Sequence, residues 1–401
     1  MISRKIVAVA TVAGLVALGG WVIATRAQHG TAVKGVPIDA RLSLGKPTVY
    51  RNLTVFPLYD AGAKNTNEYV TLDEGLKSGQ VKVKESKDGG AVNTLYVTNT
   101  GRKPLYLMAG EVVLGGQQDR TLGRDQIVSA GQQNVPVTVF CVEHGRWSGR
   151  SEFGQSAPTV AGKDIRAYAM NGEFDAAKSR TAARTGVQAS PSFAGEPSLH
   201  ANSNRMLGHL QRQSAARSTD TGDHVARAQQ KVWDGVAAKN AKLKIENPTG
   251  TYRDALTMNG GDARTSMPAY VRSLSESLGS DPHLVGVVAA VNGKVIAADS
   301  FSEPALFRKL WIKLLRSYAA DAVEQADNPS VGSEPKGSIT SRQVKAFMAE
   351  AKNEKSKEEN VSSDGRVRRY NSKNAAVYGL IPGKAGFGGG GKALHESVIS
   401  K

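Results

Sequence analysis

The hydrophobic and polar residues between Thr48 and Trp147 alternate in the way that strands do. Five segments show this alternation and are separated by clusters of Gly, Asn and Asp: Leu53–Tyr59, Gly79–Ser86, Ala91–Thr100, Lys103–Gly116 and Asn134–Glu143. A period of two puts alternate side chains on one buried face. Several short strands at this spacing predict an antiparallel, sandwich-like assembly. A short helix interrupts it, because Thr71 and Glu74 form a capping-box pair and Gly79 ends the segment.

Helical spacing of apolar residues replaces this alternation farther along. It predicts helices over Arg205–Ala216, Asp223–Lys242 and, from Pro304, to about Gln325. Asn292 and Gly293 lie between two apolar runs, where both central positions of the favoured two-residue turn need positive φ. The segment Leu284–Phe301 is therefore predicted to be a hairpin.

Nineteen uncharged residues, Ile6 to Ala24, follow Arg4 and Lys5. A helix of this length rises about 28 Å, close to the hydrocarbon thickness of a bilayer. The preceding charges orient the N-terminus inside, so the sequence predicts a single-pass cell-membrane anchor with the bulk of the chain on the extracytoplasmic side. A cleaved signal ending at Ala27 is the alternative, and it would leave a secreted or periplasmic protein.

Together these patterns predict an α+β protein. An antiparallel, β-rich N-terminal half would pack with C-terminal helices and a hairpin, behind one transmembrane or signal helix. The predicted parts are an anchor or signal (1–27), a tether (28–46), the main domain with a mobile insertion near 178–204 (47–326), a charged linker with a short helix at Ser341–Ala351 (327–365), a hairpin that completes the domain (366–382) and a glycine-rich tail (383–401).

The chain carries a formal net charge of +16, which favours anionic partners such as an anionic small molecule or an acidic polymer. No long basic run is present, so scattered Lys and Arg that keep the protein soluble are the alternative explanation. No nucleic-acid motif, metal-ligand spacing or cofactor signature occurs. Cys141 is the single cysteine, which excludes an intrachain disulfide and a cysteine-based zinc site.

The stretch LMAGEVVLGGQQDRTLGRD, Leu107 to Asp125, carries the first candidate chemistry. Backbone N–H groups at a glycine turn bind phosphate, and Arg120 adds a fork of donors. The spacing matches neither the P-loop nor the dinucleotide fingerprint. A strand, a glycine turn and a second strand, with polar residues facing water, therefore remain the alternative.

A second cluster lies at Cys141–Trp147. Cys141 and His144 are three residues apart, so a catalytic pair would need a turn to bring them together. A lone cysteine in an apolar strand is typically a small core residue, and we predict a structural role for it. Glu143, His144 and Arg146 are more plausible as the rim of a binding site. Asp299, near the end of a strand, is a candidate site acid or a loop cap.

Five segments occur in a fixed order: VTLDEGL, AGEVVLGGQQDRTL, VPVTVFCVEHGRW, QQKVW, and DSF followed by LLRSYAADA. In this combination the chain resembles the ARPP-1 domain family, a bacterial domain associated with ADP-ribosylglycohydrolases and rhodanese-type phosphatases, over roughly Asn52 to Leu380. The resemblance implies a role near ADP-ribose, NAD or phosphorylated-ligand chemistry. It supplies no catalytic residues. The candidate ligand-binding residues that match its motifs are Glu111, Gln118, Arg120, Glu143, Arg146 and Trp147.

Three functions follow as hypotheses. The first is an exported ligand-binding domain, the second a hydrolase of an ADP-ribose-like substrate with Glu111 or Glu143 as general base, and the third an envelope structural or interaction protein that binds acidic polymer. Strand ends are where loops converge on sites. We therefore expect Gly110–Arg120 and Glu143–Trp147 to meet, and a pocket holding Glu111, Arg120 and Arg146 together would favour the first two hypotheses.

Overall fold

The computed structural model describes residues 36–37, 41–85, 92–146, 149, 151–184, 221–257, 266–326, 338–352, 357–362, 365–383 and 392–401. Three sequence predictions lie outside these residues: the apolar segment Ile6–Ala24, the helix Arg205–Ala216 and the candidate residue Trp147. Within the described ranges, no helix combines the length and the apolar character that crossing a bilayer requires.

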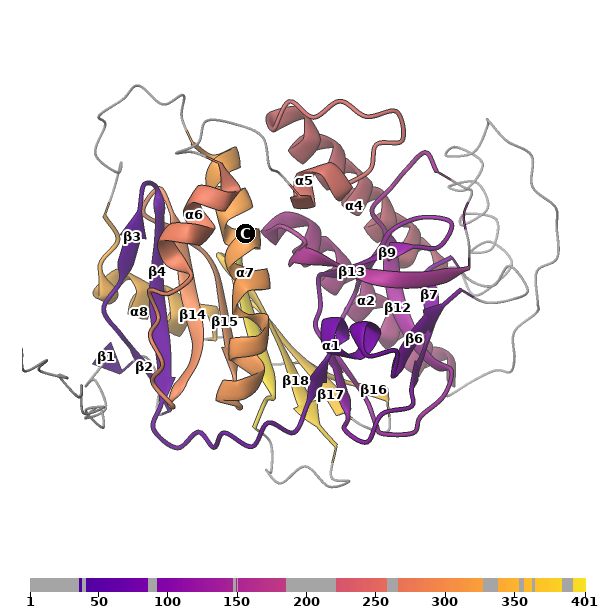
Figure 1. Cartoon of the computed structure of the whole chain (residues 1–401), viewed down its shortest axis with the longest axis horizontal. Helices are drawn as coiled ribbons and strands as arrows, with labels where there is room; N and C mark the ends of the chain where they lie inside the picture. Colours follow the sequence, from indigo (N-terminus) through magenta and orange to yellow (C-terminus); the bar gives the residue numbers. More distant parts are fainter. Residues whose placement is uncertain are drawn as a thin grey trace, which may run out of the picture. The chain divides into compact units, whose positions relative to one another are not determined.

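A ten-stranded antiparallel sheet, here called the large sheet, joins strands from both ends of the described chain (Figure 1). Its order is β1-β2-β4-β14-β15-β19-β18-β17-β16, and β3 also pairs with β4. The strands are β1 (Val36–Pro37), β2 (Leu42–Leu44), β3 (Thr48–Tyr50), β4 (Leu53–Asp60), β14 (Leu284–Val291), β15 (Lys294–Phe301), β16 (Lys357–Ser362), β17 (Gly365–Asn371), β18 (Ala375–Pro382) and β19 (His395–Ser400).

Both predicted hairpins are present in this sheet. Strands β14 and β15 are joined at Asn292 and Gly293, whose φ angles are 49° and 75°. Strands β17 and β18 pair along their length and form the second hairpin. In each case a few neighbouring residues fix the connection.

Two predictions about the large sheet are wrong. The region 383–401 is not only a glycine-rich tail, because β19 pairs with β15 on one side and β18 on the other. Its Val398 and Ile399 enter cores on opposite faces of the sheet. The segment is too short and too polar to show a clear strand period in the sequence. Likewise, β4 pairs with β14 and does not join the strands that follow it in sequence.

The remaining N-terminal strands close into a six-stranded barrel rather than a sandwich, in the order β10-β12-β7-β6-β13-β9. Their bounds are β6 (Val81–Lys84), β7 (Thr94–Asn99), β9 (Glu111–Gly115), β10 (Arg120–Leu122), β12 (Val135–Cys141) and β13 (Glu152–Val160). Alternate residues, among them Val83, Val97 and Val139, fill the interior. A small sheet, β11 (Gln126–Val128), β8 (Leu105–Leu107) and β5 (Val70–Thr71), adjoins it. The α+β, mainly antiparallel class is confirmed.

Helices cover the outer side of the barrel. Helix α2 (Lys163–Arg184) packs along α4 (Thr221–Lys242), and both contact β12, while α5 (Arg253–Thr257) contacts β13. Since α2 continues to Arg184, the first part of the predicted insertion 178–204 is helical. Gln229 of α4 takes the place of a neighbouring strand, because its side chain bonds both the N–H and the C=O of Cys141, at 2.9 and 2.8 Å.

The large sheet has helices on both faces. Helices α6 (Met267–Leu274) and α7 (Pro304–Glu324) pack on one face, and α8 (Ser341–Ala351) packs on the other. The predicted charged linker 327–365 thus contains α8, as expected, and also β16. Helix α1 (Leu72–Lys77) has the predicted capping box, in which Thr71 accepts from the Glu74 N–H and the Glu74 carboxylate accepts from the Thr71 N–H.

Candidate functional site

The motif stretch Leu107–Asp125 runs through β9 and β10 and contributes to three separate groups of charged and polar side chains, most of them buried. We call them the mouth cluster (Glu85, Gln118, Asp119, Arg120, Glu143, Arg146 and Arg253), the Glu111 cluster (Asp73, Glu111, Ser156 and Lys313) and the His395 cluster (Asp125, Arg166, Asp299, Tyr318 and His395). Only the first contains several of the predicted site residues.

The mouth cluster forms because of strand register. Arg120 lies opposite Cys141, two residues before Leu122, whose side chain fills the barrel interior. Since alternate residues share a face, Arg120 points to the inner side, at the end of the barrel next to the Gly115–Gly116 turn. Glu85 follows the inward Val83 by two residues on β6 and bonds Arg120 there, at 3.4 Å.

The glycine pair of the motif makes the turn above this mouth. Gly115 and Gly116 have φ angles of 131° and 57°, and a Cβ on Gly116 would lie 2.3 Å from the Phe153 ring. Positive φ and the close ring together require glycine. The pair is therefore explained by the turn, and phosphate binding is not needed to account for it.

The two predicted segments do meet at this turn. Arg146 donates from Nε to Glu143 (2.8 Å), from Nη1 to the Gly116 carbonyl (3.0 Å) and from Nη2 to Asp119 (3.3 Å). Asp119 also receives two bonds from Arg253, at 2.8 and 3.0 Å. These contacts hold the β9–β10 turn, the end of β12 and helix α5 together.

Two donors beneath these ion pairs have no acceptor. Arg120 uses Nη1 for the Gln118 side-chain oxygen (3.2 Å) and Nη2 for Glu85. Its Nε, and the side-chain nitrogen of Gln118, are buried and have no hydrogen-bond partner among the described residues. Arg120 is 3% exposed and Gln118 0%. Buried donors are satisfied in nearly all native proteins, so an acceptor from water or a ligand would complete these two. Arg166 Nε and Trp233 Nε1, away from the mouth, are unpartnered in the same way among the described residues.

Glu111 is not part of this mouth. Its carboxylate accepts from the Met108 N–H (2.9 Å) and from Lys313 of α7 (2.8 Å), which also bonds Asp73 and Ser156. Glu111 therefore does not share a pocket with Arg120 and Arg146, which is the arrangement that would have favoured the first two hypotheses.

Lys313 and Ser156 resemble a serine–lysine nucleophile pair, which needs a neutral amine. Burial disfavours the charged form of Lys313, but the attraction of Glu111 and Asp73 outweighs it, so the pKa of Lys313 is raised. Burial in turn raises the pKa of Glu111 despite the neighbouring ammonium. The lysine thus stays protonated and donates to Ser156, which argues for a structural ion pair.

The His395 cluster ties the barrel side to the large sheet. His395 bonds Asp125 through Nδ1 (2.6 Å) and Asp299 through Nε2 (3.0 Å). Asp299 also receives two bonds from Arg166, at 2.7 and 3.1 Å, and one from the Tyr318 hydroxyl. Of this cluster only Asp299 was a candidate from the sequence, because the other members lie far apart along the chain.

Burial lowers the pKa of His395, but Asp125 and Asp299 outweigh this effect and raise it to about 9. Burial also raises the pKa of Asp299, and Arg166 and His395 reverse that shift to well below its usual value. Both imidazole nitrogens therefore donate to carboxylates. With neither nitrogen left to accept a proton, this histidine stabilises the junction and is not a general base.

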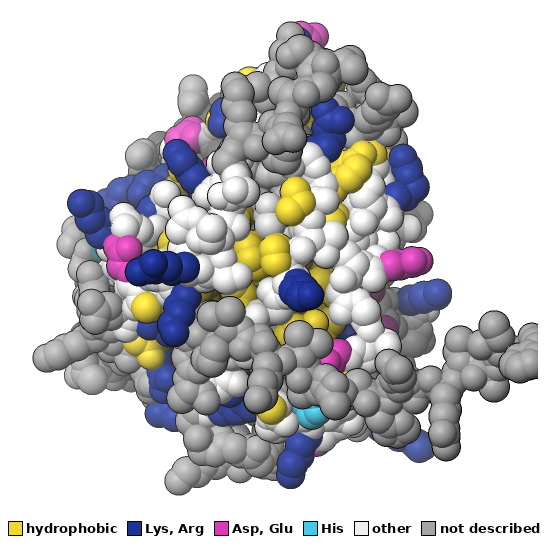
Figure 2. Space-filling model, turned by 90° about the vertical axis from the view of Figure 1, so that its left-hand side faces the viewer, with side chains coloured by type: hydrophobic (Ala, Val, Ile, Leu, Met, Phe, Trp, Pro, Cys, Tyr) yellow, Lys and Arg dark blue, Asp and Glu magenta, His cyan; other side chains and the backbone are white. Residues whose placement is uncertain are grey.

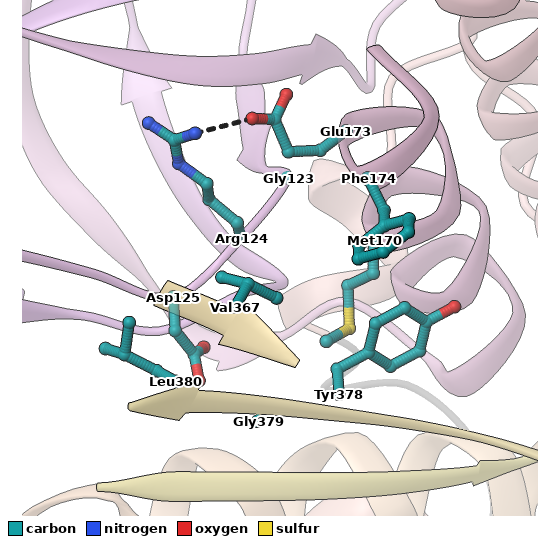
Figure 3. A pocket seen from close by; sticks show the side chains of 10 residues that line it. All are labelled: Gly123, Arg124, Asp125, Met170, Glu173, Phe174, Val367, Tyr378, Gly379 and Leu380. Atoms are coloured by element: carbon teal, nitrogen blue, oxygen red, sulfur yellow. Dashed lines mark hydrogen bonds and ion pairs between the residues drawn. The ribbon is translucent and has the colours of Figure 1, made fainter. Parts of the chain in front are cut away.

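A narrow pocket lies beside this cluster, and Figure 3 shows the side chains around it. The Arg124–Glu173 ion pair (2.7 Å) and Asp125 supply its polar groups. The rest of the lining is mainly apolar and comes from α2, β17 and β18.

A more polar hollow of about 290 Å³ lies between α2 and α4. Three lysines (Lys231, Lys239 and Lys242) and three carboxylates (Asp164, Asp234 and Glu324) line it, so neither charge dominates. Lys239 and Lys242 both bond Glu324, at 2.6 and 2.8 Å. The balance of lysines and carboxylates gives no basis for an anion site here.

Cys141 is fully buried at the base of the mouth. Burial raises the pKa of its thiol, although Arg120 opposes the shift. His144 does not approach it and packs edge-on against Trp233, with ring centres 4.6 Å apart, where burial lowers its pKa. This geometry gives no cysteine–histidine pair and is what the predicted structural role of Cys141 requires.

The mouth residues that sequence analysis missed are Glu85, Asp119 and Arg253. Asp119 lies inside the quoted motif, between the candidate residues Gln118 and Arg120, and this position could have marked it as a site residue. Nothing near Arg253 marked it, because its partner Asp119 is 134 residues away.

A family model described as ARG and Rhodanese-Phosphatase-superfamily-associated Protein domain, ARPP-1, matches residues 41–399. No curated protein and no solved structure matches the chain. The match includes all three clusters, and it extends beyond both ends of the region over which the sequence motifs were recognised.

Proposed function

The chain belongs to the ARPP-1 family, and from this premise we propose that it binds a small ligand at the mouth of its barrel without acting on it chemically. The ligand contributes a hydrogen-bond acceptor, from a phosphoryl, carboxylate or carbonyl group, to the Nε of Arg120 and the side-chain nitrogen of Gln118. The observation that carries the proposal is that these two buried donors have no acceptor among the described residues. An unsatisfied buried donor costs about 1–3 kcal/mol, which an acceptor from a ligand would recover.

The surroundings of these donors support a binding site. The mouths of β-barrels are common ligand sites, and few polar groups in such sites fix the orientation of the ligand. Glu143 and Arg146 have a positioning role in this proposal, because they hold the β9–β10 turn over the floor. ADP-ribose and NAD enter as test ligands on the strength of the family resemblance alone.

Hydrolysis is the weaker hypothesis because its proposed bases are occupied. Glu111 bonds Lys313 and a backbone N–H, and Glu143 bonds Arg146 and the Thr249 hydroxyl (3.0 Å). A general base must reach a water or a substrate proton. Binding of acidic polymer also lacks specific support on the face in Figure 2, where Lys and Arg side chains are spread out and do not gather into one patch.

We place this activity on the extracytoplasmic side of the cell membrane, on the basis of Arg4, Lys5 and the apolar segment Ile6–Ala24. Protease added to intact spheroplasts should digest the bulk of the chain. Full protection, with cytosolic marker proteins also intact, would contradict export. N-terminal sequencing that begins at Gln28 would replace the anchor with a cleaved signal.

Ligand binding is tested by calorimetric titration of the full chain with ADP-ribose, NAD and inorganic phosphate, and by ligand-observed NMR with small amides and carboxylates. At least one compound should bind, and Arg120→Lys should weaken it tenfold or more, because lysine keeps the charge and loses the Nε donor. Arg272→Lys, at an exposed position on α6, is the matched control. Absence of binding by every compound, or equal binding by both variants, would refute the proposal.

A further inference from the structure

The charges at the mouth narrow the class of ligand. Three arginines (Arg120, Arg146 and Arg253) and three carboxylates (Glu85, Asp119 and Glu143) contact one another there. Three positive and three negative charges sum to zero among the described residues. An oxyanion would add a negative charge to a cluster whose described charges already balance.

We propose that the group received at the mouth is the uncharged carbonyl oxygen of a primary amide or urea, and this inference rests on the proposed function. A carbonyl oxygen has two lone pairs, which match the two donors on Arg120 and Gln118. These donors belong to neighbouring groups, since Arg120 Nη1 bonds the Gln118 side-chain oxygen at 3.2 Å. An acceptor bound at one of these residues would therefore lie next to the other residue.

Burial decides between a charged and an uncharged acceptor. Arg120 and Gln118 are almost completely buried, so any acceptor that reaches them loses most of its water. Burying an ion without a counter-charge costs several kcal/mol more than burying a neutral polar group that is fully hydrogen-bonded. A neutral carbonyl accepts hydrogen bonds from such donors without this cost.

The rim of the mouth also suits an amide. Glu85 lies at the rim, and its side chain is 15% exposed. Its Oε1 accepts from Arg120 and from the Gln117 N–H at 3.1 Å. A carboxylate has about four lone-pair sites, so Glu85 can also accept from the NH2 group of an amide. The carbonyl oxygen of the amide would thus meet donors on Arg120 and Gln118, and its NH2 group would meet the Glu85 carboxylate.

The barrel interior limits how much of the ligand enters. Below Arg120 the lumen is filled by Leu122 and Val139 of the inner core, and the Phe153 ring packs beside the Gly116 turn at the mouth itself. Only the terminal group of the ligand can therefore occupy the mouth, with the remainder outside. Small amides are thus adequate probes of this site.

The test compares probes of the same shape that differ in charge. Acetamide and acetate, and benzamide and benzoate, are titrated into the full chain and followed by saturation-transfer NMR. We expect each amide to bind at least tenfold more tightly than its carboxylate. Gln118→Glu removes one donor and adds a negative charge, so it should abolish amide binding while the circular dichroism spectrum stays unchanged.

The outcomes separate this inference from the function on which it rests. Carboxylates that bind as tightly as the amides, or more tightly, would overturn the preference for a neutral group and leave binding at the mouth intact. Binding of neither class, nor of the phosphorylated compounds, would overturn both. Amide binding that persists in Gln118→Glu and in Arg120→Lys would place the amide site elsewhere and overturn the inference.

Discussion

Asp299 is the centre of the junction between the barrel and the large sheet, so Asp299→Asn is the most informative single change. The carboxylate accepts two bonds from Arg166, one from His395 and one from Tyr318. Asparagine keeps the shape, removes the charge and replaces one acceptor oxygen by a donor nitrogen. That nitrogen would then face donors, because every partner of Asp299 in this cluster donates to it.

The size of the effect follows from burial. Asp299 and His395 are 0% exposed and Arg166 is 2% exposed, so solvent cannot replace the lost charge. Removing one partner from a buried ion pair costs about 3–5 kcal/mol. The free energy of unfolding of a typical domain is about 5–15 kcal/mol, so the variant should lose a large fraction of its stability.

Urea unfolding followed by tryptophan fluorescence measures this loss. The midpoint should fall while the slope of the transition stays constant, because the surface exposed on unfolding is unchanged. Glu276→Gln is the matched control, since Glu276 is exposed and the substitution is of the same kind. The control should change stability by less than about 0.5 kcal/mol. A loss below about 1 kcal/mol in Asp299→Asn would refute the reasoning.

The same cluster predicts a pH dependence. The pKa of His395 rises from 6.5 to about 9 on folding, so its contribution is fully present below pH 6.5 and is lost as the pH rises through 9. The shift corresponds to a contribution on the order of 3 kcal/mol. The pKa of Asp299 is lowered, so its contribution is present above its ordinary value of 3.8 and is lost in acid. Unfolding titrations from pH 4 to 10 should show a smaller alkaline loss in Asp299→Asn than in the wild type.

Three further changes test other parts of the structure. Gly110→Ala should lower the free energy of unfolding, measured in urea, by about 2 kcal/mol or more, because Gly110 has a φ of 85° and a Cβ there would lie 2.8 Å from the Arg166 side chain. Gly79→Ala is the control that isolates the backbone strain, since Gly79 has a φ of 69° and open space around it. Cys141→Ser should reduce stability and leave amide binding unchanged, and alkylation of Cys141, followed by mass spectrometry, should be slow until urea is added. Lys313→Met should lower the free energy of unfolding by about 3–5 kcal/mol. Adding Glu111→Gln should recover part of that loss, since it removes the uncompensated carboxylate charge. Equal stability of the single and double variants would contradict the ion pair.

Local sequence signals predicted local structure well. The Asn292-Gly293 turn and the Thr71–Glu74 capping box are confirmed, because each depends on four or fewer neighbouring residues. Strand existence was also predicted over most of 48–147. The closure of the barrel was not, because alternation specifies which face of a strand is buried and leaves its neighbours open.

The hydrogen-bond and ion-pair partners of the candidate residues could not be predicted from the sequence, for a similar reason. Glu111 pairs with Lys313, which is 202 positions away, and no local pattern links them. The meeting of Gly110–Arg120 with Glu143 and Arg146 was predicted, since both segments end strands in turns. Which charges would pair there was not, because that depends on register and on Arg253 from α5.

The place of β19 has a consequence for how the protein is made. This strand lies between β15 and β18 and is translated after both. Until it leaves the ribosome, β15 and β18 each present an open edge to other nascent chains, and open edges promote aggregation. The residues from His395 to Lys401 also bring the imidazolium that bonds two buried carboxylates, Asp125 and Asp299. A ribosome that stalls before His395 would therefore release a chain that aggregates instead of folding, although nearly all of its strands are already made.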